Sequence, residues 1–207
     1  MPDRRLILLF FFLVLSLNSF CIFRYVQGNA SPKSKSPGIN EELLQTGDIV
    51  LRQGKGIVSG WFTRMSQHDP CFSHAGIILR RGGSVRVISC TQDCIKPGII
   101  AQETGEFLTT ATTAKFGVFR MSFSQEERRL LGEMLEHDIL HPLPFDSKFE
   151  LGTDSAYYCT EYIFRRMNSI TPGKLSHISV SGSWKYIAPE DLYLYSKGRF
   201  ILSGVLQ

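Results

Sequence analysis

The folded part of this 207-residue chain lacks a surplus of positive charge. The net charge of +4 arises entirely within the first 40 residues, where five basic side chains outnumber one acidic side chain. These residues are Arg4, Arg5, Arg24, Lys33 and Lys35, against Asp3. Because binding to nucleic acid needs a basic face on the folded domain itself, the composition argues against a nucleic-acid partner.

The cysteines also lack the spacings that bind zinc. The chain has five cysteines but no CxxC pair and no histidine at ligand spacing, so we expect no metal and no cofactor. Cys71, Cys90, Cys94 and Cys159 lie beyond the N-terminal segment, and an oxidising compartment would permit a disulfide. Cys90 and Cys94 are the nearest pair, but neighbours on a strand and turn often miss the required geometry. The disulfide state therefore stays open.

The N-terminal 30 residues have the pattern of an export signal. Residues 6–17 carry no charge and follow a short charged start, as in a secretory signal peptide. Gly28 and Ala30 place small residues where signal peptidase cleaves, which favours cleavage after Ala30. The apolar run extends to Phe23, so an uncleaved membrane anchor, associating through residues 6–23, is the second interpretation. Both interpretations predict an exported protein, periplasmic or extracytoplasmic.

A linker and a single domain follow the export segment. Residues 31–40 are rich in serine, proline and lysine at their start, a composition that is typical of unfolded linkers. Residues 41–207 are long enough to bury one core, and they contain no internal repeat.

Hydrophobic patterning and turn signals in residues 41–207 predict an α+β fold. Strands are expected at 47–52, 73–80, 85–89, 116–121 and 200–205, and a short one at 145–149. Helices are expected at 57–65, from 125 onward, at 157–167 and, as a short turn, from 189. Gly82 and Gly83 predict a hairpin turn between two of the strands.

Two of these helices have identifiable starts. Ser124 and Glu127 form a capping box, and Asp154 or Ser155 is expected to cap the helix at 157–167. The apolar stripe expected after Ser124 consists of Leu130, Leu131, Met134 and Leu135.

Cys159 is the strongest candidate for a nucleophile. It falls in the first turn of a predicted helix, where the helix dipole is expected to lower the thiol pKa. Free backbone N–H groups in the same turn could hold an oxyanion. The alternative is a small buried hydrophobic residue, the commoner fate of a lone cysteine.

His74 is the candidate base. It lies within an apolar strand, where its polar ring needs a partner, and a thiol across a cleft would supply one. The alternative is a core histidine that bonds to backbone. Gly76 beside it lets a backbone or a substrate approach closely.

The other polar candidates have structural interpretations. Asp48, after Gly47, is expected to organise a turn, and Glu161 points away from Cys159 on the helix and is expected to act as a structural hydrogen-bonding group. His137 and His141 are four residues apart at a helix end, which could bind metal, but Pro142 disturbs that turn and favours a solvated face. His68 and His177 lie in polar segments without a pattern.

Three segments together resemble a known family. The sequences Gly-Asp-Ile-Val-Leu at 47–51, Ser-His-Ala-Gly-Ile-Ile at 73–78 and Tyr-Cys-Thr-Glu-Tyr at 158–162 resemble the permuted papain-like enzymes of the NlpC superfamily, YiiX-like branch. That family places its histidine strand before its cysteine helix, as here. Residues 187–193 are similar to its closing segment. The resemblance implies a circularly permuted papain-like fold with an antiparallel sheet packed against helices.

The resemblance also implies roles for individual residues. Cys159 would attack a carbonyl and His74 would move the proton, with Ser73 in the same motif and Tyr158 assisting the oxyanion site. The family is expected to carry a glutamate on the next strand, where this sequence has Ser89. A serine accepts a hydrogen bond but supplies no negative charge to an imidazolium, and Gln92 nearby could substitute.

Three functions follow from this resemblance. The first is an exported thiol-dependent hydrolase that cleaves an amide bond in a cell-wall peptide or an amidated or lipid-linked substrate. The second is a lipid acyltransferase or esterase of the same fold, similar to lecithin:retinol acyltransferase-like proteins, with Trp61 and Phe62 on an apolar wall. The third is a catalytically impaired binding module, which Ser89 favours.

Overall fold

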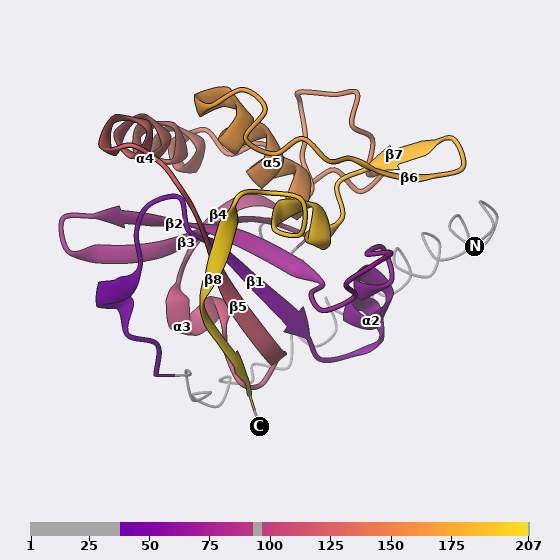
Figure 1. Cartoon of the computed structure of the whole chain (residues 1–207), viewed down its shortest axis with the longest axis horizontal. Coiled ribbons are helices and arrows are strands. Elements are labelled where there is room, and N and C mark those ends of the chain that lie inside the picture. The colour runs from indigo at the N-terminus through magenta and orange to yellow at the C-terminus, as the bar shows by residue number, and fades with distance from the viewer. Residues whose placement is uncertain (1–37, 93–96, 207) are drawn as a thin grey trace, which may run out of the picture.

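The computed structural model describes residues 38–92 and 97–206. Six antiparallel strands form one sheet in the order β4-β3-β2-β1-β5-β8 (Figure 1). Their bounds are β1 Ile49–Gly54, β2 His74–Arg81, β3 Ser84–Thr91, β4 Gly98–Glu103, β5 Thr113–Met121 and β8 Gly198–Val205. A separate hairpin consists of β6 Ser179–Ser181 and β7 Trp184–Tyr186. The α+β class and the antiparallel sheet are confirmed.

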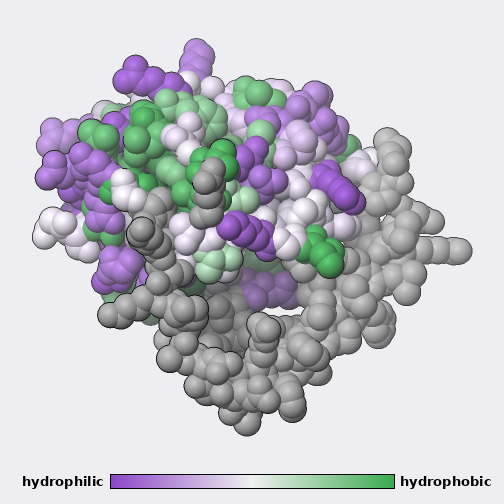
Figure 2. All heavy atoms as spheres, turned by 90° about the horizontal axis from the view of Figure 1, so that it is seen from below, coloured by the Kyte–Doolittle hydropathy of each residue, from purple (hydrophilic) through white to green (hydrophobic). Residues whose placement is uncertain are grey.

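Helices lie on both faces of the sheet. They are η1 Glu41–Leu43, α2 Ile57–Thr63, α3 Thr104–Phe107, α4 Gln125–Leu140, α5 Cys159–Ile170 and η2 Pro189–Leu192. The long helices α4 and α5 cover one face, and α3 lies on the opposite side (Figure 1). Seen from below, hydrophobic residues reach part of the surface among hydrophilic ones (Figure 2).

The alternation of side chains along each strand explains the two layers of core. In β1, Ile49 and Leu51 pack into the core that includes α5, whereas Val50 packs into the core beneath the sheet. Successive side chains point to opposite faces of a strand, so a sheet buried on both sides needs a nearly continuous apolar run. The run from Ile49 to Leu51 meets this requirement.

The turn and capping predictions are largely confirmed. Gly82 and Gly83 join β2 to β3 with φ of 52° and 85°, values that a side chain would strain. Ser124 and Glu127 exchange both hydrogen bonds of a capping box at the start of α4. The apolar stripe of α4 is correct only in part, because Leu131 and Leu135 are buried but Leu130 is 40% exposed.

The segment before α5 contradicts two predictions. Residues 145–149 form no strand and contribute only an isolated parallel bridge between Phe145 and Tyr157. Tyr157 donates its N–H to Pro144 O at 3.2 Å and accepts from Asp146 N at 2.9 Å, which keeps it extended. The helix therefore begins at Cys159, and its N-cap is Tyr158 rather than Asp154 or Ser155.

The described helices include none that is long and apolar enough to cross a membrane. The leader at 1–30 and the linker up to residue 37 lie outside the described residues, as does Cys94. Export and membrane anchoring therefore stay predictions.

Candidate active site

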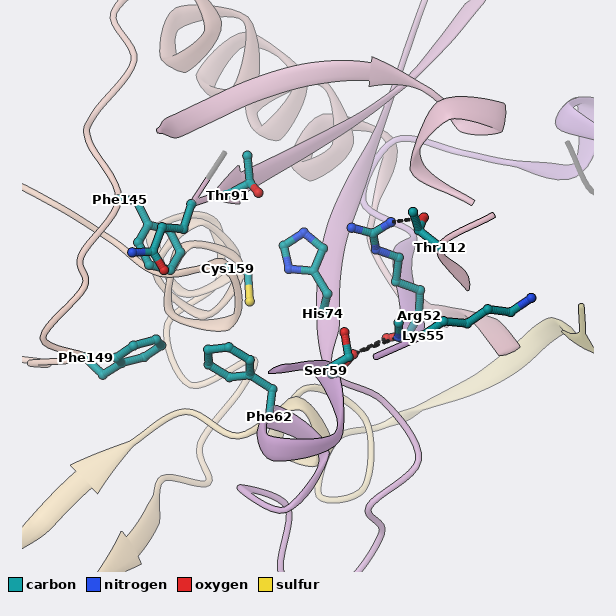
Figure 3. A pocket seen from close by; sticks show the side chains of 13 residues that line it. Arg52, Lys55, Ser59, Phe62, His74, Thr91, Thr112, Phe145, Phe149 and Cys159 are labelled. Atoms are coloured by element: carbon teal, nitrogen blue, oxygen red, sulfur yellow. Dashed lines mark hydrogen bonds between the residues drawn. The ribbon is translucent and has the colours of Figure 1, made fainter. Parts of the chain in front are cut away.

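A cavity of about 260 Å³ lies where the sheet divides beside the start of α5 (Figure 3). β2 pairs with β3 only from Ile77 and Ile88 onward, so the first residues of β2 pair with β1 alone. The lining residues are Arg52, Gly54, Lys55, Ser59, Phe62, Ser73, His74, Thr91, Gln92, Thr112, Phe145, Phe149 and Cys159. The two residues predicted to carry chemistry, His74 and Cys159, thus share one pocket.

Cys159 is the first residue of α5 and is 9% exposed. The backbone N–H groups of Ala75 and Thr160 favour the ionised form of its sulfur, as does the N–H of Cys159 itself. Ala75 lies on β2 where β3 has already separated, so its N–H is not paired with β3. The thiol therefore lies at a helix N-terminus, where backbone donors favour its ionised form.

His74 is the first residue of β2 and is half-buried. Its ring stacks on Phe107, with centroids 5.4 Å apart and an angle of 29° between the planes. Figure 3 shows the imidazole and the Cys159 thiol facing the same pocket. Among the described residues, no side chain hydrogen-bonds the His74 ring, so packing on Phe107 sets its orientation.

Burial keeps both groups uncharged at rest. Burial raises the pKa of Cys159 to about 11, although Ala75 N–H, Thr160 N–H and the Arg52 charge favour the thiolate. Burial, followed by the Arg52 charge, lowers the pKa of His74 to about 3. The prediction that the helix N-terminus lowers the Cys159 pKa is wrong here, because desolvation outweighs the dipole and the hydrogen bonds. The resting pair is a neutral thiol and a neutral imidazole.

Sequence reasoning missed Arg52. It lies opposite His74 in the β1–β2 register, and its Nη1 donates to Phe107 O at 2.8 Å and to Thr112 Oγ1 at 3.4 Å. Its guanidinium carbon is 4.8 Å from the centroid of the Phe107 ring. The available signal was a charged residue directly after the apolar run of β1, but only the strand register shows that it meets the histidine.

Ser89 does not hold the place of a third catalytic residue. It is fully buried, it is not among the residues that line the pocket, and its hydroxyl has no hydrogen-bond partner among the described residues. β3 has left β2 at this point and pairs only with β4, through Ile100. Thr91 and Gln92, further along the chain, do line the pocket.

Tyr158 does not line the pocket either. Its buried hydroxyl accepts a hydrogen bond from Ile187 N at 2.7 Å, so the predicted oxyanion role is not supported. Thr160 Oγ1 donates to Ile187 O at 2.6 Å. These two bonds attach the start of α5 to the closing segment at Ile187.

Ser73 and Asp48 make hydrogen bonds and an ion pair that hold parts of the sheet together. Ser73 Oγ lines the pocket, accepts from Gly54 N at 2.9 Å and donates to Arg52 O at 3.4 Å, which joins β1 to the start of β2. A Cβ at Gly54 would lie 2.1 Å from Ser59 Oγ, so only glycine fits there. Asp48 is buried away from the pocket and binds Arg120 at 2.6 Å, in agreement with its predicted role in a turn.

Glu161 is buried and pairs with Arg165 at 3.2 Å, and its second oxygen has no partner among the described residues. This placement matches the predicted structural role. Burial raises the pKa of Glu161 from 4.5 to about 7, despite the opposing effect of Arg165. The folded protein therefore binds this proton more tightly than the unfolded chain.

Replacing Glu161 by glutamine should change how stability depends on pH. The wild-type penalty for burying the charge is absent below pH 4.5, grows as the pH rises and is complete above pH 7. We expect the free energy of unfolding of wild type, relative to Glu161→Gln, to fall by about 3 kcal/mol between pH 4 and pH 8. Urea denaturation at both pH values measures this, with exposed Glu42→Gln as control. A difference that does not vary with pH would contradict the assignment.

The other histidines and cysteines of residues 38–92 and 97–206 do not line the pocket. His137 and His141 stack on each other at the end of α4, and His177 bonds Asp191 at 2.6 Å. Cys71, Cys90 and Cys159 are free thiols, and the buried Cys90 donates to Tyr157 O. Trp61 does not line the pocket, whereas Phe62 does.

A comparison with solved structures finds a similar fold in YiiX from Escherichia coli O157:H7. The TM-score is 0.63 at 15% sequence identity, and the match covers 78% of this chain and 98% of YiiX. No protein-family model matches the sequence. No curated protein matches it either.

YiiX is described as a metalloprotein. In residues 38–92 and 97–206 of the present chain, no three or more His, Cys, Asp or Glu side chains are grouped so that they could hold a metal ion. Among the described residues that line the pocket, the His, Cys, Asp and Glu side chains are Cys159 and His74 alone. The described residues therefore do not fit a metal centre, and the likeness concerns the fold. The chain is an α+β protein with a YiiX-like fold.

Proposed function

We propose that this protein is a thiol-dependent hydrolase of the permuted papain-like NlpC superfamily that cleaves an amide bond. The observation that carries the proposal is the shared pocket, in which His74 and Cys159 converge from β2 and the start of α5. These residues are 85 positions apart in the sequence, and no other cysteine or histidine is among the described residues that line the cavity. A thiol and an imidazole in one cleft are the minimum for thiol acyl transfer.

The neutral resting pair defines how the reaction would proceed. His74 takes the thiol proton as Cys159 Sγ attacks the carbonyl carbon, much as a histidine activates a serine. The N–H groups of Ala75 and Thr160, which favour the thiolate, would also stabilise the developing oxyanion. His74 then returns the proton to the leaving amine, and water hydrolyses the thioester.

Among the residues that the structure describes, 38–92 and 97–206, no carboxylate is available in the pocket to stabilise the imidazolium. None of the described lining residues is Asp or Glu, and Ser89 is not among them. In this mechanism the stack on Phe107 orients His74, and Gln92 and Thr91 are the polar side chains available from β3 and its end. We therefore expect slower turnover than a complete triad supports.

An aromatic wall favours a second candidate function. Phe62, Phe145 and Phe149 line the pocket, with centroid distances of 5.5 Å between Phe62 and Phe149 and 5.9 Å between Phe145 and Phe149. Such a wall suits an acyl chain, as a lipid acyltransferase or esterase would need. In either case we propose export through residues 1–30, with membrane association through residues 6–23 if the leader is retained.

A matched pair of substrates distinguishes these functions. We expect the leader-free protein to release p-nitroaniline from a neutral N-acyl p-nitroanilide, and to cleave the corresponding p-nitrophenyl ester faster. Cleavage of the ester alone, with acyl transfer to added alcohols, would favour the lipid enzyme. Cleavage of neither, together with a Cys159 that does not react with iodoacetamide, would reject both and leave the binding module.

A further inference from the structure

The charged side chains among the described residues that line the pocket all have the same sign. Arg52 and Lys55 line it, and none of its thirteen described residues is acidic. Lys55 extends away from the cavity in Figure 3, and its Nζ donates to Thr110 O at 2.9 Å. Arg52 is therefore the cation that faces the reacting groups.

Arg52 lacks an anionic partner among the described residues. Its Nη1 is bonded to Phe107 O and Thr112 Oγ1, whereas its Nε is buried without a hydrogen-bond partner and its Nη2 has none among the described residues. Burial lowers the pKa of this guanidinium, as expected of a cation removed from water without a counterion. Arg52 is half-buried, and a cation partly removed from water without a counterion is costly, so its position beside Cys159 suits an anionic ligand.

The geometry places this cation next to the chemistry. Arg52 is the cross-strand neighbour of His74, and its charge acts on both His74 and Cys159. Figure 3 shows the guanidinium directed towards the imidazole, on the side of the pocket opposite Phe62 and Phe149. A substrate bound over Cys159 would therefore meet a positive charge on one side and aromatic rings on the other.

We propose that Arg52 is an anion subsite, and that the substrate carries a carboxylate close to its scissile carbonyl on one side and an apolar group on the other. The carboxylate pairs with the free Nη2 of Arg52, and the apolar group packs on Phe62, Phe145 and Phe149. This inference rests on the proposed function, since it takes Cys159 as the reacting group. It specifies the substrate class as an acylated amino acid or a similar carboxylated amide.

Two alkylating reagents test the subsite without knowledge of the substrate. Iodoacetate and iodoacetamide differ little in size, but only iodoacetate carries a carboxylate. We expect Cys159 to favour iodoacetate about tenfold or more, after each rate is divided by the rate for free glutathione, because a charge-assisted hydrogen bond is worth at least that factor. Peptide mapping by mass spectrometry assigns the alkylation to Cys159.

Variants distinguish Arg52 from a general positive field. The ratio of the normalised iodoacetate rate to the normalised iodoacetamide rate should fall to about 1 in Arg52→Gln and to an intermediate value in Arg52→Lys. It should remain at the wild-type value in Lys55→Gln, the matched control. A preference that is unchanged in Arg52→Gln, or lost equally in Lys55→Gln, would overturn the subsite. Circular dichroism shows whether each variant is folded.

If Arg52→Gln does not fold, the proposal can still be tested on the wild-type protein, by asking which ligands protect Cys159 from iodoacetamide. Phenylacetate should slow iodoacetamide labelling of Cys159 in a saturable way, whereas neutral phenylacetamide should protect several-fold less. Equal protection by both would overturn the subsite. Equal normalised labelling of Cys159 by iodoacetate and iodoacetamide would reject the anion subsite but leave the proposed function standing. If neither reagent labels Cys159, the proposed function fails, and calorimetric titration with phenylacetate then decides the subsite by itself.

Discussion

In the Cys159→Ser protein we expect acylation by a neutral p-nitrophenyl ester, and all turnover, to fall to the level of the buffer control. A hydroxyl is a far weaker acid than a thiol, and burial already raises the pKa of the Cys159 thiol to about 11. Burial and Arg52 lower the pKa of His74 to about 3, so the imidazole is a weak base and activates an alcohol less readily than a thiol. Stopped-flow release of p-nitrophenolate measures the effect.

The fold should tolerate this substitution. Serine is nearly isosteric with cysteine, and it suits the first turn of a helix. We therefore expect the thermal midpoint to stay within a few degrees of wild type. Cys71→Ser, which replaces a free thiol outside the pocket, serves as the matched control and should keep full activity. Retained turnover in Cys159→Ser would show that the nucleophile is elsewhere.

In His74→Ala we expect the rate of acylation to fall by about 10²- to 10⁴-fold, the usual contribution of a general base. Because His74 is uncharged at rest, its role is to accept the thiol proton during attack rather than to hold a preformed thiolate. The same stopped-flow assay in His74→Ala and His74→Gln measures the loss. Since glutamine is polar but cannot accept the proton, the two variants should be equally slow.

Ser89→Ala provides the contrast to His74→Ala. Its hydroxyl is buried outside the pocket, so its removal should leave the acylation rate within a factor of about two of wild type. If the acylation rate fell as far in Ser89→Ala as in His74→Ala, Ser89 would take part in catalysis after all. Rescue of His74→Gln to the wild-type rate would instead reduce His74 to a positioning residue.

The features that could be predicted from the sequence are those set by local patterns. The apolar runs of β1 and β2, the Gly82–Gly83 turn and the Ser124 capping box depend on neighbouring residues, and the structure confirms them. The prediction that His74 and Cys159 lie together rested on the resemblance to a known family rather than on local patterns. The structure brings both residues to one cavity.

The features that were missed depend on contacts between distant segments. The start of α5 at Cys159 follows from the bonds that hold Tyr157 against Pro144 and Asp146, which no helical pattern reveals. Arg52 meets His74 through the β1–β2 register, and Ser89 lies outside the pocket although Thr91 and Gln92, further along the chain, line it. The shift in the Cys159 pKa depends on burial, whereas position on a helix indicated the opposite sign.

The most direct test of the account is to find where an acyl group resides during the reaction. Wild-type protein would be mixed with the p-nitrophenyl ester, quenched in acid within the burst phase, digested and mapped by mass spectrometry. We predict one acyl group per chain, on the peptide that contains Cys159, and none in Cys159→Ser. Turnover with the acyl group on another residue, or with no acyl group on Cys159 at any time, would contradict the account.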